Sequence, residues 1–191
     1  TCLKTQLFVW IYKKWIAANA LPGVFAGPEM GAQKAAWQAA FAAESANLAG
    51  FDYGQALLDL VKAFETVPHD VLVSAAREEG YPLALLRLSL AAYRLARSSG
   101  IDGIFSALII ASRGITAGSG FATSELKALL RDLMILLKAR WPELLDAKLY
   151  VDDLTLGVSG PPQVVIDTLA KAIDFTVEVL EVAMKMAVSG T

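Results

Sequence analysis

The stretch Ala147-Lys148-Leu149-Tyr150-Val151-Asp152-Asp153-Leu154-Thr155-Leu156 places two adjacent carboxylates between two short runs of strand-forming residues. Residues 148–151 and 154–158 mix aliphatic, aromatic and β-branched side chains, and Gly157 and Gly160-Pro161-Pro162 then close the segment. We therefore expect a tight hairpin with Asp152 and Asp153 at or beside its turn. Aspartate is a common turn residue, so the dipeptide by itself is most simply interpreted as a solvated turn.

Composition limits the classes of partner. The 191 residues carry a net charge of −2, which gives no overall basic field. A nucleic-acid partner would therefore need a local basic patch or metal ions. Hydrophobic residues make up 55% of the chain and the mean hydropathy is +0.49, yet no uncharged apolar run approaches the ~20 residues of a membrane-spanning helix. We expect an unusually apolar soluble domain without a membrane span, with surface for other protein segments.

A single cysteine, Cys2, excludes an internal disulfide and a cysteine zinc cluster. This fits a reducing, intracellular compartment. No targeting signal is visible at the start of the chain, and we expect the sequence to be part of a longer protein, truncated at both ends.

Hydrophobic periodicity and breaker residues predict the elements. Helices are expected at 3–20, 31–49, 70–79, 82–97, 123–140 and 163–181, and strands at 57–61, 104–110 and 185–188 besides the hairpin. Trp37 and Phe41 are four residues apart, which predicts a packed helix face. This order favours an α+β fold in which a small antiparallel sheet has helices packed on one face, with a helix-rich N-terminal portion.

Asp59 is a single acid in the apolar run at 57–61. A carboxylate in a buried strand is costly, so either Asp59 lies at the exposed end of the strand or a cation meets it. If the strand and the hairpin are neighbours, Asp59, Asp152 and Asp153 converge at one edge and repel one another unless cations bind. Oxygen-only ligands suit Mg²⁺, with Mn²⁺ possible. Two such ions would stabilise the attacking and leaving oxygens of a phosphoryl transfer, so the sequence predicts a two-metal polymerase-type site.

At this point the sequence resembles a known family. Leu58-Asp59-Leu60-Val61-Lys62-Ala63-Phe64-Glu65-Thr66-Val67-Pro68-His69 resembles motif A of reverse transcriptases, especially those of non-LTR retroelements and group II introns. Tyr150-Val151-Asp152-Asp153 resembles their motif C, the tyrosine-x-aspartate-aspartate box. Residues 114–124 resemble motif B in position and glycine placement, and residues 163–190 are similar in layout to motif D.

The resemblance implies roles for individual residues. Asp59 and Asp152 would be metal ligands and Asp153 would complete the acidic cluster, so that all three are expected catalytic and metal-site residues. Phe64 would lie under the sugar and favour deoxynucleotides, although a place in the core is an equal alternative. Gly118, Ser119 and Tyr150 are the other expected substrate-binding positions.

Several positions depart from the family pattern. The usual proline-glutamine before the motif B glycine is Thr116-Ala117 here, which removes a polar contact near the nucleotide and template. The lysine expected after the motif D strand is absent, and Lys185 is a poor substitute for it. Lys148 could face phosphate, but a solvated surface position is the simpler expectation. His69, the only histidine, is expected to serve the turn after Pro68 rather than act as a general base.

The resemblance implies the palm, with part of the fingers, of a retroelement reverse transcriptase. Residues 1–50 would be a partial fingers segment and residues 51–191 the palm with motifs A to D. The activity would be RNA-directed DNA polymerisation with two Mg²⁺ ions. The expected partners are an RNA template, a DNA primer, deoxynucleoside triphosphates, and the missing fingers and thumb segments. Two alternatives stay open: a catalytically degenerate relic, and a non-enzymatic nucleic-acid-binding module on the same topology.

Overall fold

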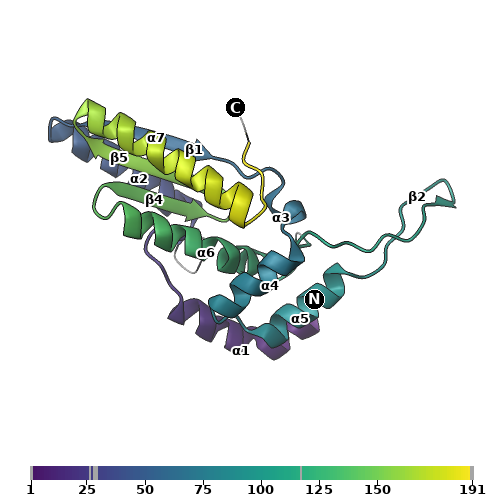
Figure 1. The fold of residues 1–191 in the computed structure, drawn as a ribbon. Helices are drawn as coiled ribbons and strands as arrows, with labels where there is room; N and C mark the ends of the chain where they lie inside the picture. Colours follow the sequence, from purple (N-terminus) through teal and green to yellow (C-terminus); the bar gives the residue numbers. More distant parts are fainter. Residues whose placement is uncertain (1, 26, 28–29, 117, 190–191) are drawn as a thin grey trace. The chain divides into compact units, whose positions relative to one another are not determined.

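A computed structural model describes residues 2–25, 27, 30–116 and 118–189 (Figure 1). The chain divides into two compact units, each built from two stretches of sequence. The first unit contains helix α1 (Cys2–Ala18) together with Phe64–Leu129, and the second contains Asn19–Ala63 together with Leu130–Thr191. Neither unit coincides with the ranges 1–50 and 51–191, whose assignment to fingers and palm stays a prediction.

The second unit is built on an antiparallel sheet with the strand order β1-β5-β4. Strand β1 (Asp52–Leu58) pairs with β5 (Asp153–Gly160), which also pairs with β4 (Leu145–Tyr150). This confirms the α+β class and the hairpin. The strand expected at 57–61 begins and ends earlier, because β1 follows its pairing with β5. Leu57 is also 76% exposed rather than buried, since it lines an open pocket.

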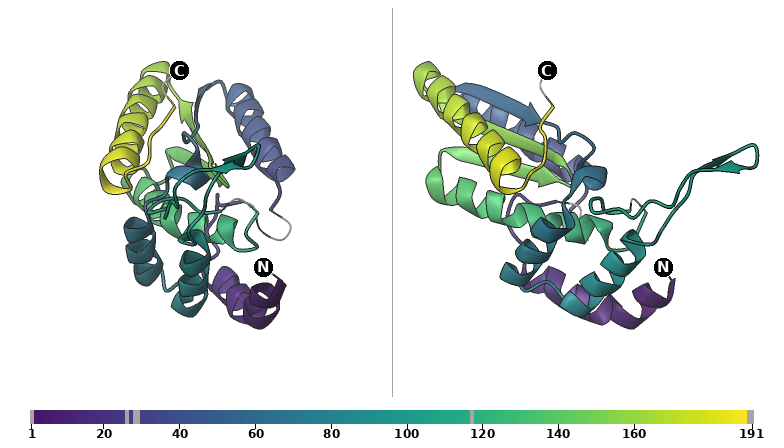
Figure 2. Two further views of the ribbon diagram at one scale, coloured as in Figure 1. Left: turned by 90° about the vertical axis from the view of Figure 1, so that its right-hand side faces the viewer. Right: turned by 45° about the vertical axis from the view of Figure 1, so that its right-hand side comes forward.

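Helices lie on both faces of this sheet, whereas the sequence predicted helices on one (Figure 2). Helix α7 (Pro162–Glu178) packs on the face formed by alternate residues of β1 and β5, where Leu154, Leu156 and Val158 are buried. Gly54 on this face leaves room for the side chains of Val165 and Leu169 of α7. A Cβ added to Gly54 would lie 2.6 Å from Val165 and 2.7 Å from Leu169.

Helix α2 (Ala32–Leu48) contacts the opposite face of the sheet. It turns toward the strands a row of small side chains, which allow a close approach: Ala32, Ala35, Ala36 and Ala39. As a result Trp37 and Phe41, expected on a packed face, are 72% and 73% exposed. The prediction for these two residues was wrong because alanine, not the aromatic pair, forms the packing side of α2.

The first unit is mainly helical. Helices α4 (His69–Glu78), α5 (Leu83–Tyr93) and the first part of α6 (Ala122–Arg140) lie close to their expected ranges, while α5 ends before Arg94. Helix α1 packs on this unit through Trp15, whose ring meets Tyr81 edge-on at 5.0 Å and whose Nε1 donates to the Glu79 carbonyl. Buried leucines fill the core of the unit: Leu72, Leu85, Leu86 and Leu126.

A two-stranded ribbon replaces the strand expected at 104–110. Strands β2 (Gly100–Ile101) and β3 (Ile104–Phe105) are two residues each, and the ribbon projects from the helices of its unit (Figures 1 and 2). Its apolar side chains are exposed because nothing in the described part of this unit covers them.

Short elements complete the two units. Helix α3 (Ala63–Thr66) lies within motif A. A π-helical turn, η1 (Val179–Ala183), extends α7, and the strand expected at 185–188 is reduced to a bridge between Leu60 and Val188. Among the described residues, no helix has the length and apolar character that crossing a membrane requires.

Candidate active site

The pairing of β1 with β5 brings Asp59 and Asp153 to the same end of the sheet. The last pair of the ladder is Leu58 with Leu154, so one further step places Asp59 opposite Asp153. Both carboxylates are exposed and both line one pocket. Asp59 therefore lies just beyond the end of its strand, which was one of the two placements that the sequence left open for it.

The motif C box forms a hairpin whose loop has two residues. Tyr150 pairs with Asp153, which leaves Val151 and Asp152 as the connecting residues. Val151 has a φ of 59°, in the left-handed region that β-branched residues rarely occupy. A positive φ at the first loop residue is typical of a type II′ turn, in which glycine is the usual residue. The loop beside the carboxylates is thus strained, a property that clusters at functional sites.

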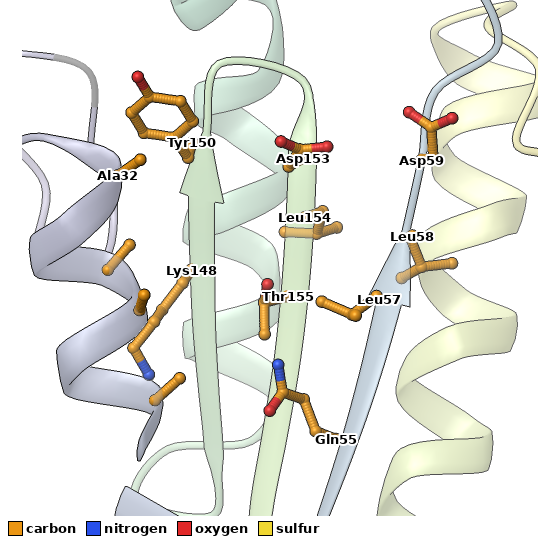
Figure 3. Close-up of a pocket in the computed structure, with 13 residues that line it drawn as sticks. Ala32, Gln55, Leu57, Leu58, Asp59, Lys148, Tyr150, Asp153, Leu154 and Thr155 are labelled. Atoms are coloured by element: carbon orange, nitrogen blue, oxygen red, sulfur yellow. The ribbon is translucent and has the colours of Figure 1, made fainter. Parts of the chain in front are cut away.

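The pocket is a cavity of about 460 Å³ between α2 and the sheet face that carries Asp59 and Asp153 (Figure 3). Asp59, Asp153 and Tyr150 lie at its hairpin end, and Gln55, Leu57 and Thr155 line it farther along the strands. Because the facing residues of α2 are alanines, side chains do not fill this space. The sequence did not predict the role of these alanines, since their value depends on which helix face meets the sheet.

Lys148 lies on the same sheet face but is buried, with 5% of its side chain exposed. Its ammonium group forms an ion pair with Asp146. The expected solvated position is therefore wrong, because the side chain runs between β4 and α2 instead of into solvent. Asp146 partly satisfies the charge of Lys148, so the lysine is already engaged before any phosphate could approach.

The Tyr53 side chain lies across the sheet face near the ion pair of Lys148 and Asp146. Its hydroxyl would lie 2.6 Å from a Cβ on Gly157, so a larger residue there would displace the Tyr53 side chain. Gly157 lies within β5. The sequence had instead suggested that Gly157 ends this strand. Burial, and secondly the charge of Asp146, raises the pKa of Tyr53. The phenol thus stays neutral at physiological pH.

The backbone around Asp59 is held by the last residues of the chain. The Ser189 amide donates to the Asp59 carbonyl at 2.9 Å, and the Val61 amide donates to the Ala187 carbonyl at 2.9 Å. Leu60 and Val188 form the bridge between these bonds. The sequence predicted a strand here but gave no sign that its partner would be the Asp59 segment.

The donor set for a metal consists of carboxylate oxygens. Asp59 and Asp153 are exposed on one pocket lining, and Asp152 is half-buried in the adjacent turn. Within the described ranges, no group of three histidine, cysteine, aspartate or glutamate side chains is arranged to hold a metal ion. Two carboxylates with open space beside them suit Mg²⁺, which keeps several waters and takes further oxygens from phosphates. The assignment of Asp59, Asp152 and Asp153 to metal ions stays a prediction.

The other expected substrate-binding residues belong to the first unit. Phe64 is half-buried, and its carbonyl accepts from the Ile115 amide at 2.6 Å. Gly118 has a φ of 83°, and Ser119 hydrogen-bonds through its side chain to Tyr93. Their roles toward a nucleotide stay predictions, and Ala117, the departure in motif B, lies outside the described residues.

His69 joins the motif A segment to the glycine-rich loop of this unit. The ring is 1% exposed, its Nε2 lies 2.9 Å from the Gly114 carbonyl, and the Arg94 Nε donates to its Nδ1 at 3.1 Å. This pattern requires the neutral tautomer protonated on Nε2. The expected structural role of His69 is confirmed, because both ring nitrogens are used inside the protein.

Comparisons with known proteins place the fold. No protein-family model matches the sequence, and no curated protein matches it. By structure the chain is similar to a Candida tropicalis telomerase truncated from its C-terminal domain. The TM-score is 0.72 at 10% identity, over 97% of this chain and 39% of that one.

A second similar structure is the Candida albicans telomerase in complex with a TWJ fragment of telomeric RNA. Its TM-score is 0.60 at 12% identity, over 99% of this chain and 34% of that one. The chain thus spans between a third and two fifths of the telomerase chains. It has the mixed α+β fold of the matching part of these telomerase chains.

Proposed function

We propose that this chain is the palm, with part of the fingers, of an RNA-directed DNA polymerase from a retroelement. The observation that carries the proposal is the joint position of Asp59 and Asp153 on the lining of one pocket, next to the turn that holds Asp152. The reaction would transfer deoxynucleotides to a primer 3′ end on an RNA template, with release of pyrophosphate. The similarity in fold to telomerase supports a polymerase of this class.

The proposed site divides its tasks among a few residues. Asp59 and Asp153, with Asp152 beside them, would hold Mg²⁺, which when bound neutralises triphosphate charge and activates the primer hydroxyl. The β1–β5 ladder fixes the spacing of the Asp59 and Asp153 carboxylates, and the short hairpin loop fixes the position of Asp152. The alanine face of α2 leaves the space in which a substrate could lie.

A second candidate is a nucleic-acid-binding protein of the same fold without catalytic activity, as in a degenerate relic. The observation that favours it is that the described carboxylates do not form a three-residue metal group. It predicts template binding with no metal-dependent change in stability and no incorporation of nucleotides.

Primer extension on an RNA template tests the polymerase proposal. We expect Asp59→Asn and Asp153→Asn each to lower incorporation by about 100-fold or more, the scale on which loss of a charged transition-state contact acts. Asp174→Asn on the exposed side of α7 makes the same chemical change away from the site and should leave incorporation unchanged. Equal incorporation by wild type and Asp59→Asn would overturn the proposal.

Metal-dependent stability separates the two candidates. We expect millimolar Mg²⁺ or Mn²⁺ to raise the melting temperature of the wild type, because a ligand that binds only the folded state stabilises it. The double variant Asp59→Asn/Asp153→Asn should lose this response and Asp174→Asn should keep it. An identical response in all three proteins, with no incorporation by the wild type, would favour the inactive candidate.

A further inference from the structure

A second pocket lies in the first unit, where the loop after the ribbon meets the second half of motif A. It is a cavity of about 410 Å³. We call it the arginine pocket, and its lining consists of Glu65, Arg97, Arg113, Gly114, Ile115 and Thr116. Two guanidinium groups and one carboxylate give this lining a net positive charge, in a chain whose overall charge is −2.

The two arginines are positioned by backbone pairing. Arg97 and Ile109 exchange hydrogen bonds of 3.0 and 2.8 Å, and Arg113 bridges to Pro68. One guanidinium nitrogen of Arg97 donates to the Tyr93 carbonyl at 2.6 Å, which leaves its other donors available. Among the residues that the structure describes, neither guanidinium group pairs with a carboxylate, so both charges can meet a ligand.

The loop that carries Arg113 is held before any ligand binds. Gly114 has a φ of 97°, and a Cβ there would lie 3.0 Å from the Glu65 carbonyl, so the loop packs tightly on that segment. The Gly114 amide donates to the Val67 carbonyl at 2.8 Å, and the Gly114 carbonyl lies 2.9 Å from the His69 Nε2. A site that is already ordered loses less entropy on binding.

We propose that the arginine pocket binds a phosphate of a single-stranded nucleic acid through Arg97 and Arg113. Guanidinium groups match phosphate oxygens in a planar, two-pronged geometry that is stronger and more directional than an ammonium contact. The Thr116 hydroxyl, exposed on the same lining, can add a neutral donor. The inference rests on the proposed function and deepens it, since it names a second place, in the first unit, where a template strand would be held.

The ribbon next to the pocket favours a strand over a free nucleotide. Arg97 and Ile109 form the base of this ribbon, and Phe105 near its tip is 71% exposed. The Phe105 ring lies against Gly100, 2.6 Å from the position of an added Cβ, while most of the side chain is open to solvent. Aromatic rings beside a basic groove are how proteins bind single strands without sequence preference.

Fluorescence anisotropy with a labelled single-stranded oligonucleotide, in EDTA and without nucleoside triphosphates, tests the proposal independently of catalysis. We expect Arg97→Gln/Arg113→Gln to weaken binding and to reduce the slope of log affinity against log salt by about 0.7, the value for one lost phosphate contact on a single strand. Arg77→Gln/Arg87→Gln removes two exposed arginines from α4 and α5 of the same unit and should leave the slope nearly unchanged.

Two further arms sharpen the result. Glu65→Gln removes the acidic residue of the lining and should tighten oligonucleotide binding, whereas Phe105→Ala should weaken it by about tenfold without changing the salt slope. Tripolyphosphate should compete only weakly. Complete displacement by tripolyphosphate at micromolar concentration would instead identify a triphosphate site and overturn the assignment to a strand.

Equal losses of oligonucleotide affinity in the arginine double variant and its control would overturn the assignment of phosphate binding to the arginine pocket. Retention of the folded state is checked by the thermal melting of each variant. The polymerase proposal fails separately, through primer extension by Asp59→Asn, so the failure of one proposal is distinguishable from the failure of the other.

Discussion

The amide nitrogen of Ser189 donates a hydrogen bond to the carbonyl oxygen of Asp59 over 2.9 Å. The residues that follow η1 thereby fix the backbone of the proposed catalytic carboxylate, which lies beyond the end of β1 and outside the sheet ladder. Asp59 is exposed, so its position depends on this backbone contact rather than on burial of its side chain.

Ser189→Pro should remove the hydrogen bond to the Asp59 carbonyl, because proline has no amide hydrogen. We expect the free energy of unfolding to fall by about 1 kcal/mol, the net value of one hydrogen bond. Ser189→Ala keeps the amide and should match the wild type in urea denaturation. A proline variant as stable as the alanine variant would contradict the role given to this bond.

Val151→Gly should relieve the strain in the hairpin loop. Val151 has a φ of 59°, which is costly for a β-branched residue and free of penalty for glycine. We expect a gain of up to about 1 kcal/mol in the free energy of unfolding, measured by chemical denaturation. Val158→Gly, a change of the same kind in a buried part of β5, should be strongly destabilising. A loss of stability in Val151→Gly would show that the loop is not strained.

His69→Ala should destabilise the first unit by about 2 kcal/mol, because it leaves the part-buried Gly114 carbonyl and the Arg94 guanidinium without their partner. Hydrogen exchange should show faster exchange at the Gly114 amide, which donates to Val67. His69→Gln can replace part of the hydrogen bonding and should lose less. If alanine and glutamine cost the same, the two ring contacts do not carry the stability.

Alkaline pH should destabilise the first unit through two buried tyrosines. Burial, followed by the charge of Glu125, raises the pKa of Tyr81 and of Tyr93 above the usual 10.0. Above pH 10 the unfolded chain releases these protons and the folded chain keeps them, so the free energy of unfolding falls as pH rises. The slope is at most about 1.4 kcal/mol per pH unit for each tyrosine, and below about pH 9 the contribution is constant.

Urea midpoints between about pH 8 and 11 measure this effect. Tyr81→Phe should flatten the alkaline slope because it removes one of the two retained protons. Tyr150→Phe makes the same chemical change in the second unit and serves as the control. Identical slopes in all three proteins would show that the two buried tyrosines do not govern alkaline stability.

Local patterns predicted the elements whose formation depends on near neighbours. The hairpin was predicted from β-branched runs around two aspartates, and α2, α6 and α7 from apolar periodicity. Where a long-range partner decides the outcome, prediction failed. The apolar periodicity of α2 includes Trp37 and Phe41, but the alanine face of the helix meets the sheet. Lys148 is buried between β4 and α2, with its ion-pair partner Asp146 on the same strand.

The sequence by itself determined that a hairpin carries Asp152 and Asp153 at or beside its turn and that a lone acid, Asp59, stands in an apolar run, because turn chemistry and strand propensity act over a few residues. Only the tertiary structure decided that Asp59 lies one step beyond the β1–β5 ladder, opposite Asp153. That relationship depends on the register between strands almost a hundred residues apart. Register is set by which faces of β1 and β5 bury against α7, so no local pattern contains it.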